Sequence, residues 1–394
     1  MNILKQVAAV SLMNLRNIPQ RWSTSLVIVV GIAGVVGVLT AILAMGEGFR
    51  ATLGQAGKED QVIVMRSGAT SELTSGLGRE AVDLIKGSAG VARNAAGQPI
   101  ASAEILVIAD LPKRGVGTLA NAPIRGVQPG AFELRPEVQI VEGRGFTPGP
   151  RELVVGRGAA SQFEGLEVGA RLAFRDADWT VVGIFTANGS VHESELWGDA
   201  ETVMSAYRRD GFQSVTVQLE GVESLASLQA ALADEPRLNV EAQTLRAYYA
   251  EQSRQMSLII NVLGYTVGYI MAIGALFGAL NTMYAAVSTR GREIATLRAL
   301  GFGGGAIVAS VMLEALLLAL LGGVLGGGLA WLVFNGYTVS TLGANFSQVA
   351  FDFRVSGALL GKGIGWALAI GFVGGLLPAW RAARQPVTTA LRAL

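Results

Sequence analysis

The chain has 394 residues, of which 51% are hydrophobic and 15% charged, with a formal net charge of +1 and no cysteine. A soluble globular chain carries about 25% charged residues, so the deficit indicates membrane-spanning segments. The lack of cysteine excludes disulfides, a thiol nucleophile and thiolate-ligated zinc or iron–sulfur sites.

Residues 1–22 precede the first long apolar stretch and carry a stripe of mostly apolar residues at helical spacing. The stripe consists of Leu4, Val7, Ser11, Leu15 and Ile18. It predicts an amphipathic helix that lies on the cytoplasmic leaflet of the membrane. A simple extension of the first span is the alternative, but Pro19 favours a break.

Four stretches lack charge for long enough to cross a bilayer, which takes about 20 apolar residues. They are residues 23–45, 256–282, 302–334 and 355–380. Glu314 is the only charged residue in the third stretch and Lys362 the only one in the fourth. A signal peptide is the alternative for the first stretch. However, its uncharged run exceeds the about 7–15 residues of a signal sequence, and no clean cleavage site follows.

The charge distribution predicts the orientation. Residues 46–254 hold 27 acidic and 20 basic residues, whereas the remainder holds 3 acidic and 11 basic ones. Short loops rich in Lys and Arg stay in the cytoplasm. We therefore expect both termini, including the tail 381–394, and the loop 283–301 to be cytoplasmic. Residues 46–255 and the short loop 335–354 would then lie outside.

The large segment 46–255 mixes strand and helix patterns. β-branched or alternating runs predict strands at 61–65, 105–109, 138–141, 153–155, 171–174, 179–185 and 215–219. Helical patterns occur at 79–86, 199–209, 223–234 and 244–254, and the last is expected to continue into the second span. The predicted fold is four transmembrane helices with an α/β extracytoplasmic domain between the first two. A β-rich part at about 135–190 is inserted in this domain.

Motifs for catalysis are weak. The run Gly357–Gly363 is one residue short of a phosphate-binding Walker A motif and lacks its hydroxyl residue, so we expect no nucleotide site and no cofactor in this chain. The only histidine, His192, has Glu193 and Glu195 nearby, which would suit a metal site, but a solvated loop is favoured. We expect no catalytic residue and no metal, and no nucleic acid as a partner.

Small residues four apart recur in the last three spans. Pairs of this kind let helix backbones approach closely in lipid. The residues predicted to pack helices, within or between subunits, are Gly274, Gly278, Gly322, Gly326, Gly371 and Gly375.

Glu314 is an acidic residue deep in a span, where such groups are costly and usually face protein or water. A proton or ion pathway is one interpretation. We favour a structural hydrogen bond, to Ser310 one turn back or across a subunit interface, because no second ionisable residue is expected at the same depth.

The loop 283–301 contains a short amphipathic helix that Gly301 can end. Such a helix on the cytoplasmic face could dock a soluble partner, although a plain interfacial helix is the alternative. The candidate docking residues are Arg290, Arg292, Glu293, Ile294, Leu297 and Arg298.

The run EIATLRALGF, the following span with Glu314 and LLGGVLGG, and the ending LPAWRAARQPVTTALR resemble the FtsX-like permease domain of ABC transporters of the MacB type. The start of the first span is similar to that family as well. The resemblance implies a mechanotransmitting permease of the bacterial inner membrane. Its loop around Glu293 would dock onto an ATPase that binds ATP and Mg²⁺. Because the first span starts near residue 22, we expect this ATPase to be a separate polypeptide.

The resemblance also implies a second permease subunit, identical or related, and we expect an identical one. A periplasmic adaptor or substrate-binding protein is a further candidate partner. The expected function is export, or extraction of lipid or lipoprotein from the membrane. The alternative is an FtsX-like protein that transports nothing and activates a periplasmic enzyme. A membrane-anchored enzyme is a third hypothesis, disfavoured because the sequence lacks a catalytic constellation.

Overall fold

The computed structural model divides the chain into two compact units. The helical unit comprises Met1–Glu47, Ile259–Tyr337 and Phe353–Leu394, and the α/β unit comprises Gly48–Leu258 and Thr338–Asp352. The structure describes residues 6–7, 10–13, 22–115, 117–174, 177–342 and 348–384. Most of the predicted N-terminal helix at 1–22 and of the tail at 381–394 lies outside the described residues.

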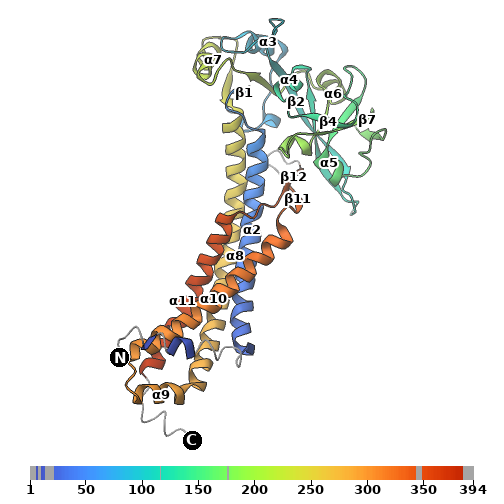
Figure 1. Cartoon of the computed structure of the whole chain (residues 1–394). Helices are drawn as coiled ribbons and strands as arrows, with labels where there is room; N and C mark the ends of the chain where they lie inside the picture. Colours follow the sequence, from blue (N-terminus) through green and yellow to red (C-terminus); the bar gives the residue numbers. More distant parts are fainter. Residues whose placement is uncertain are drawn as a thin grey trace. The chain divides into compact units, whose positions relative to one another are not determined.

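Four long helices contribute residues to the helical unit (Figure 1). They are α2 (Trp22–Ala56), α8 (Leu245–Thr289), α10 (Gly304–Phe334) and α11 (Gly357–Arg384). Each is long and apolar enough to cross a membrane, as predicted. α8 is continuous, which confirms that the helical pattern at 244–254 runs into the second span. Both α2 and α8 extend more than one turn beyond the predicted spans, and α2 ends at Ala56.

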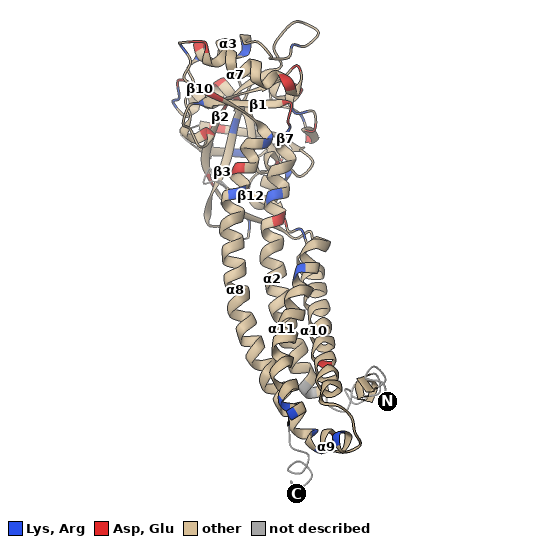
Figure 2. Cartoon of the chain, turned by 90° about the vertical axis from the view of Figure 1, so that its left-hand side faces the viewer, with Lys and Arg blue, Asp and Glu red and all other residues tan. Residues whose placement is uncertain are grey.

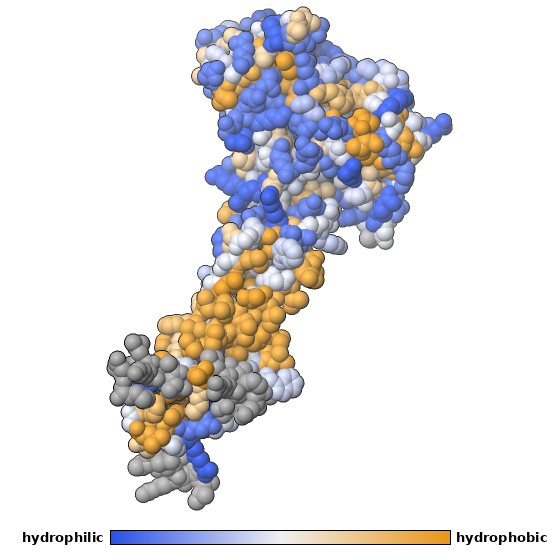
Figure 3. All heavy atoms as spheres, viewed as in Figure 1, coloured by the Kyte–Doolittle hydropathy of each residue, from blue (hydrophilic) through white to orange (hydrophobic). Residues whose placement is uncertain are grey.

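The side chains of these helices differ from those of the α/β unit. Charged residues are sparse along α2, α8, α10 and α11 and frequent in the α/β unit (Figure 2). Hydrophobic residues cover much of the visible face of the helices (Figure 3). The interior of the bundle is apolar too, and includes Ile32, Val36, Ala319, Ala367 and Ala379.

A ten-stranded sheet forms the centre of the α/β unit. Its strands are β1 (Gln61–Arg66), β2 (Ala101–Pro112), β3 (Leu119–Val127), β4 (Gln139–Gly143), β5 (Glu152–Gly156), β6 (Arg171–Phe174), β7 (Ala177–Thr186), β8 (Leu196–Asp199), β9 (Ser214–Gln218) and β10 (Val240–Thr244). Around it lie α3 (Arg79–Gly87), α4 (Gly130–Leu134), α5 (Arg157–Gln162), α6 (Ala200–Ala206), α7 (Leu225–Ala233) and the 3₁₀ turns η2 (Glu72–Thr74), η3 (Val191–Ser194) and η4 (Val222–Ser224).

The strand order is β10-β1-β9-β2-β3-β8-β5-β7-β4, and β6 pairs with β7. Strands from the two ends of the segment thus pair at one edge, and strands from its middle form the other. Most neighbours are antiparallel, but β3 with β8 and β5 with β7 are parallel. All seven predicted strands are present, whereas β3, β8 and β10 were missed.

The segment between α10 and α11, predicted as a short loop, contains a hairpin of β11 (Thr338–Leu342) and β12 (Gln348–Asp352). The hairpin belongs to the α/β unit. The Ala350 backbone N–H donates to Ser194 Oγ over 2.8 Å, and the Phe351 ring packs edge-on against Phe49. Two separate segments of the chain therefore build the α/β unit.

Candidate functional site

The loop between α8 and α10 folds into the short helix α9 (Gly291–Ala299), as predicted. Arg290 precedes it as the N-cap residue. After the helix, Gly301 has a φ of +92°, which favours glycine. The Gly301 N–H donates to the Arg298 carbonyl and the Phe302 N–H to the Leu297 carbonyl, each over 3.0 Å. This pair of bonds is a Schellman motif, so the turn that ends α9 is well defined.

One face of α9 is exposed and the opposite face is buried. The exposed positions follow helical spacing and form what we call the α9 stripe: Arg292, Glu293, Thr296, Ala299 and Leu300. Leu300, the C-cap residue of α9, is 72% exposed. On the other face, Ile294 and Ala295 are buried in the helical unit.

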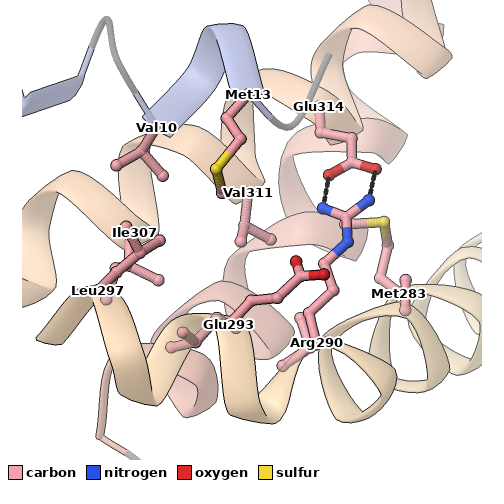
Figure 4. A pocket seen from close by; sticks show the side chains of 12 residues that line it. Val10, Met13, Met283, Arg290, Glu293, Leu297, Ile307, Val311 and Glu314 are labelled. Atoms are coloured by element: carbon pink, nitrogen blue, oxygen red, sulfur yellow. Dashed lines mark hydrogen bonds and ion pairs between the residues drawn. The ribbon is translucent and has the colours of Figure 1, made fainter. Parts of the chain in front are cut away.

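Arg290 pairs with Glu314 of α10, and Glu293 of the α9 stripe lines the same pocket (Figure 4). Arg290 Nη1 lies 2.6 Å from Glu314 Oε2 and Arg290 Nη2 lies 2.8 Å from Glu314 Oε1. Both side chains are 6% exposed. Parallel N–H···O bonds of this kind fix the relative orientation of the two groups as well as their distance. Val10 and Met13 of the N-terminal segment line the same pocket.

The predicted docking residues therefore do not form one surface. Arg292 and Glu293 are exposed, Leu297 and Arg298 are half-buried, and Arg290 and Ile294 are buried. The expectation that Glu314 has no ionisable residue at its depth is wrong, because Arg290 reaches it from the start of α9. The pairing of Glu314 with Arg290 supports the structural interpretation over an ion pathway.

The predicted packing glycines also separate into two groups. A Cβ at Gly322 or Gly326 would meet the backbone of Val29 or Ala33 in α2. A Cβ at Gly371 or Gly375 would meet Ala319 or Ala315 in α10. These four glycines lie at close helix contacts. By contrast, no described atom lies within 4 Å of a Cβ at Gly274 or Gly278 in α8.

A second group of buried charges lies in the α/β unit and was not predicted. Arg125 of β3 makes paired bonds to Glu72 (2.7 and 3.0 Å) and to Glu195 (both 2.8 Å). It also donates to Glu104 over 2.8 Å, and Arg135 donates to the same carboxylate over 2.6 and 3.1 Å. We call these five residues the Arg125 network.

Neighbouring polar groups complete the Arg125 network. Trp197 Nε1 donates to Glu195 over 2.7 Å, and the Ser214 hydroxyl donates to Glu72 over 2.8 Å. Burial opposes the ionisation of Glu195, but the charges of Arg125 and His192 outweigh it and hold the pKa of this carboxyl well below its usual range. Buried charges with this many ion pairs and hydrogen bonds suit a structural role rather than catalysis.

His192 illustrates what the sequence interpretation missed. It was assigned to a solvated loop, but it is 1% exposed, lies 3.2 Å from Glu195 through Nδ1 and contacts the Trp197 ring. The assignment is wrong because Arg125, distant in sequence, draws Glu195 inward. The signal available in the sequence was the apolar pair Leu196 and Trp197 directly after the charged residues. Within the described ranges, no group of three or more acidic or histidine side chains could hold a metal ion.

Comparison with protein families matches two models along the chain. Residues 25–235 match the MacB-like periplasmic core domain, and residues 247–387 match the FtsX-like permease C-terminal domain. Together they cover most of the sequence, including every residue of α9 and of the Arg125 network.

Several curated proteins are similar to the chain. It is 26% identical to the pyoverdine export ATP-binding/permease protein PvdT of Pseudomonas fluorescens over 93% of this chain and 56% of that protein. It is 24% identical to the uncharacterized ABC transporter permease YknZ of Bacillus subtilis over 50% of this chain and 49% of that protein. For the macrolide export protein MacB of Neisseria gonorrhoeae, the identity is 25% over 55% of this chain and 34% of that protein. The chain thus spans about half the length, or less, of these relatives.

Two solved structures align with about half of the chain. The extracellular domain of the noncanonic ABC-type transporter YknZ aligns with a TM-score of 0.36 and 16% identity, covering 47% of this chain and 100% of that domain. The periplasmic region of MacB from Actinobacillus actinomycetemcomitans aligns with a TM-score of 0.37 and 11% identity, covering 51% of this chain and 94% of that region.

Proposed function

Because the chain belongs to the MacB/FtsX-like family of ABC permeases, we propose that it is a transmembrane subunit that couples ATP hydrolysis by a separate ATPase to movement of its α/β unit. The α9 stripe is the observation that carries this proposal. It is a short, well-capped helix between two spans, and its exposed face combines Arg292 and Glu293 with the exposed Leu300. A short exposed helix face with both charged and apolar residues offers polar and apolar contacts to a soluble partner.

The charge distribution supports an orientation for this multi-pass membrane protein. The basic short segments would place both termini and α9 in the cytoplasm, where ATP is available, and the α/β unit in the periplasm of a bacterial inner membrane. ATP and Mg²⁺ would bind to the partner ATPase. A second permease subunit, identical to this one, would complete the transporter.

For the cargo, we propose only a chemical class. Relatives carry names for pyoverdine and macrolide export. Export, or extraction of lipid or lipoprotein, with help from a periplasmic adaptor or substrate-binding protein, is the function that we propose. The alternative, activation of a periplasmic enzyme without transport, would use the same docking helix and differ only in the periplasmic partner.

The test compares two substitutions of an exposed apolar residue by aspartate in the full-length chain. Leu300→Asp changes the α9 stripe, and Val222→Asp changes an exposed residue (51%) of η4 in the α/β unit. The tagged chain is purified from the membrane of its own host, and co-purifying proteins are identified by mass spectrometry. We expect a protein with a Walker A motif to co-purify equally with the wild type and Val222→Asp. With Leu300→Asp its yield should fall about tenfold or more, as for an interface hot spot.

Two results would contradict the proposal. One is the absence of such an ATPase from the wild-type preparation. The other is an equal yield of it with Leu300→Asp.

A further inference from the structure

A buried ion pair joins the junction between α8 and α9 to α10, beside the apolar cluster that Ile294 shares with Ile307 and Val311. Arg290 directly follows α8, which ends at Thr289, and it caps the start of α9. Its side chain forms an ion pair with Glu314, which lies almost three turns into α10. The pair therefore joins the start of α9 to a point well inside the next span (Figure 4).

The other end of α9 is joined to α10 through the chain and through apolar side chains, because Leu297 lines the same pocket as Ile307 and Val311. Leu300–Gly303 form the chain connection, and two of its four residues are glycines. Gly301 adopts a backbone conformation with positive φ, and the Gly303 N–H donates to Gln6 of the N-terminal segment over 3.2 Å. A connection of this kind sets where α9 ends, but it does not hold the start of α9 against α10.

The surroundings of the ion pair keep water away from it. Met283, Val287, Ile307 and Val311 line the same pocket as Arg290 and Glu314. Charge pairs shielded from solvent are screened little and resist being pulled apart. A bidentate guanidinium–carboxylate contact also resists rotation, which a contact between two apolar side chains does not.

We propose that the Arg290–Glu314 ion pair is the positioning contact that makes α10 follow a displacement of α9. The inference rests on the proposed function, in which an ATPase moves α9. In this scheme the exposed α9 stripe receives the force, and the buried pair transmits it to α10. Neither residue touches ATP or cargo, so both act through α10.

The test uses variants that remove the pair without leaving a lone buried charge. Replacing one partner of a buried pair is costly, whereas replacing both by apolar residues of similar size is often tolerated. Arg290→Met with Glu314→Met is therefore the main variant. Arg290→Lys is the second, since it keeps the charge but loses the planar fork. The matched control is Arg79→Met with Glu201→Met, which removes another bidentate pair, exposed on the α/β unit.

The readout is hydrogen–deuterium exchange of the full chain purified with its ATPase, before and after trapping with Mg-ATP and vanadate. Co-purification of the ATPase and the melting temperature of each variant are measured alongside. In the wild type and the control we expect trapping to change exchange in both α9 and the first half of α10. In the double methionine variant the change in α9 should persist while the change in α10 falls at least about fivefold, because α10 no longer follows. In Arg290→Lys the α10 response should fall by about half.

The outcomes separate the two proposals. If the double methionine variant and Arg290→Lys both keep the wild-type response in α10, the inference is overturned while the docking proposal stands. If trapping leaves α9 unchanged in the wild type, the docking proposal fails and the inference fails with it. If the double variant does not fold, Arg290→Lys decides the question by the same criterion.

Discussion

The chain has a buried arginine in each unit, Arg125 in the α/β unit and Arg290 in the helical unit, and the two contact different numbers of carboxylates. Arg125 contacts three carboxylates that come from η2, β2 and the turn before β8. Among the described residues, Arg290 forms an ion pair with one carboxylate, that of Glu314. Both arginines are at least 94% buried, so burial alone does not distinguish them.

The difference lies in what each contact can do. The Arg125 network joins five segments of one unit, so a segment that moves breaks bonds to the others. The Arg290–Glu314 pair joins two neighbouring helices one to one, so both can move together while the pair stays intact. The first arrangement suits a rigid domain core, and the second suits transmission of a displacement.

The largest expected effect is that of Arg125→Met. This change removes the buried arginine that contacts all three carboxylates of the Arg125 network, while Arg135 still contacts Glu104. Removing one partner of a buried pair costs about 3–5 kcal/mol, and here several bonds are lost together. We expect the α/β unit to unfold or to lose most of its hydrogen-exchange protection in β3 and β8. Arg79→Met, which breaks only an exposed pair, should leave this protection unchanged. Equal protection in Arg125→Met would show that the network does not hold the unit.

Arg290→Met should destabilise the chain less. It leaves one buried carboxylate, that of Glu314, without its arginine partner. We expect a loss of about 3 kcal/mol, at the low end of the range for broken buried pairs. Unfolding in detergent measures it. The further change Glu314→Met should restore most of the stability, and failure to do so would indicate that the apolar pair packs poorly at this contact.

Acid should destabilise the α/β unit by protonating carboxylates of the Arg125 network. The pKa values of Glu104 and Glu195 are held below the usual range in the folded chain: although burial opposes their ionisation, the buried arginines outweigh it. Carboxylates of this kind stabilise the fold above their unfolded pKa of about 4.3, and the contribution is lost as the pH falls through that value toward the folded one. We expect the protection of β3 and β8 to decline below about pH 4.3.

The Arg125→Met variant provides a control for the sign of this effect. Its unpaired buried carboxylates would have raised pKa values, so acid should stabilise whatever fold remains. A parallel decline in both proteins would mean that other groups cause the acid sensitivity.

The sequence predicted the four spans because a bilayer demands long uncharged stretches, and it predicted α9 because Gly301 and the helical pattern mark its ends. It predicted the strands whose residues form β-branched or alternating runs. It missed β3, whose sequence LANAPIRGV contains a proline and a glycine and no alternation. Elements are therefore predictable where residues close together in the sequence form a clear pattern.

The ion pairs could not be predicted in the same way. Arg290 and Glu314 are 24 residues apart, and Arg125 and Glu195 are 70 apart. A single sequence contains no information about which distant charges meet. Arg290 was therefore assigned to an exposed docking surface, and His192 to a solvated loop, because each was judged by its neighbours along the chain.

The smallest expected effect concerns how the helical unit is held together apart from its ion pair. Gly326→Ala would place a methyl group against the Ala33 backbone of α2, whereas Gly274→Ala adds one where no described atom lies within 4 Å. Overpacking a close contact costs about 1–3 kcal/mol. An alanine at an open helical position gains up to about 1 kcal/mol over glycine. Unfolding of both variants in detergent should therefore shift in opposite directions. A loss of stability in Gly274→Ala would indicate that a second subunit packs against this part of α8, since the described chain leaves it open.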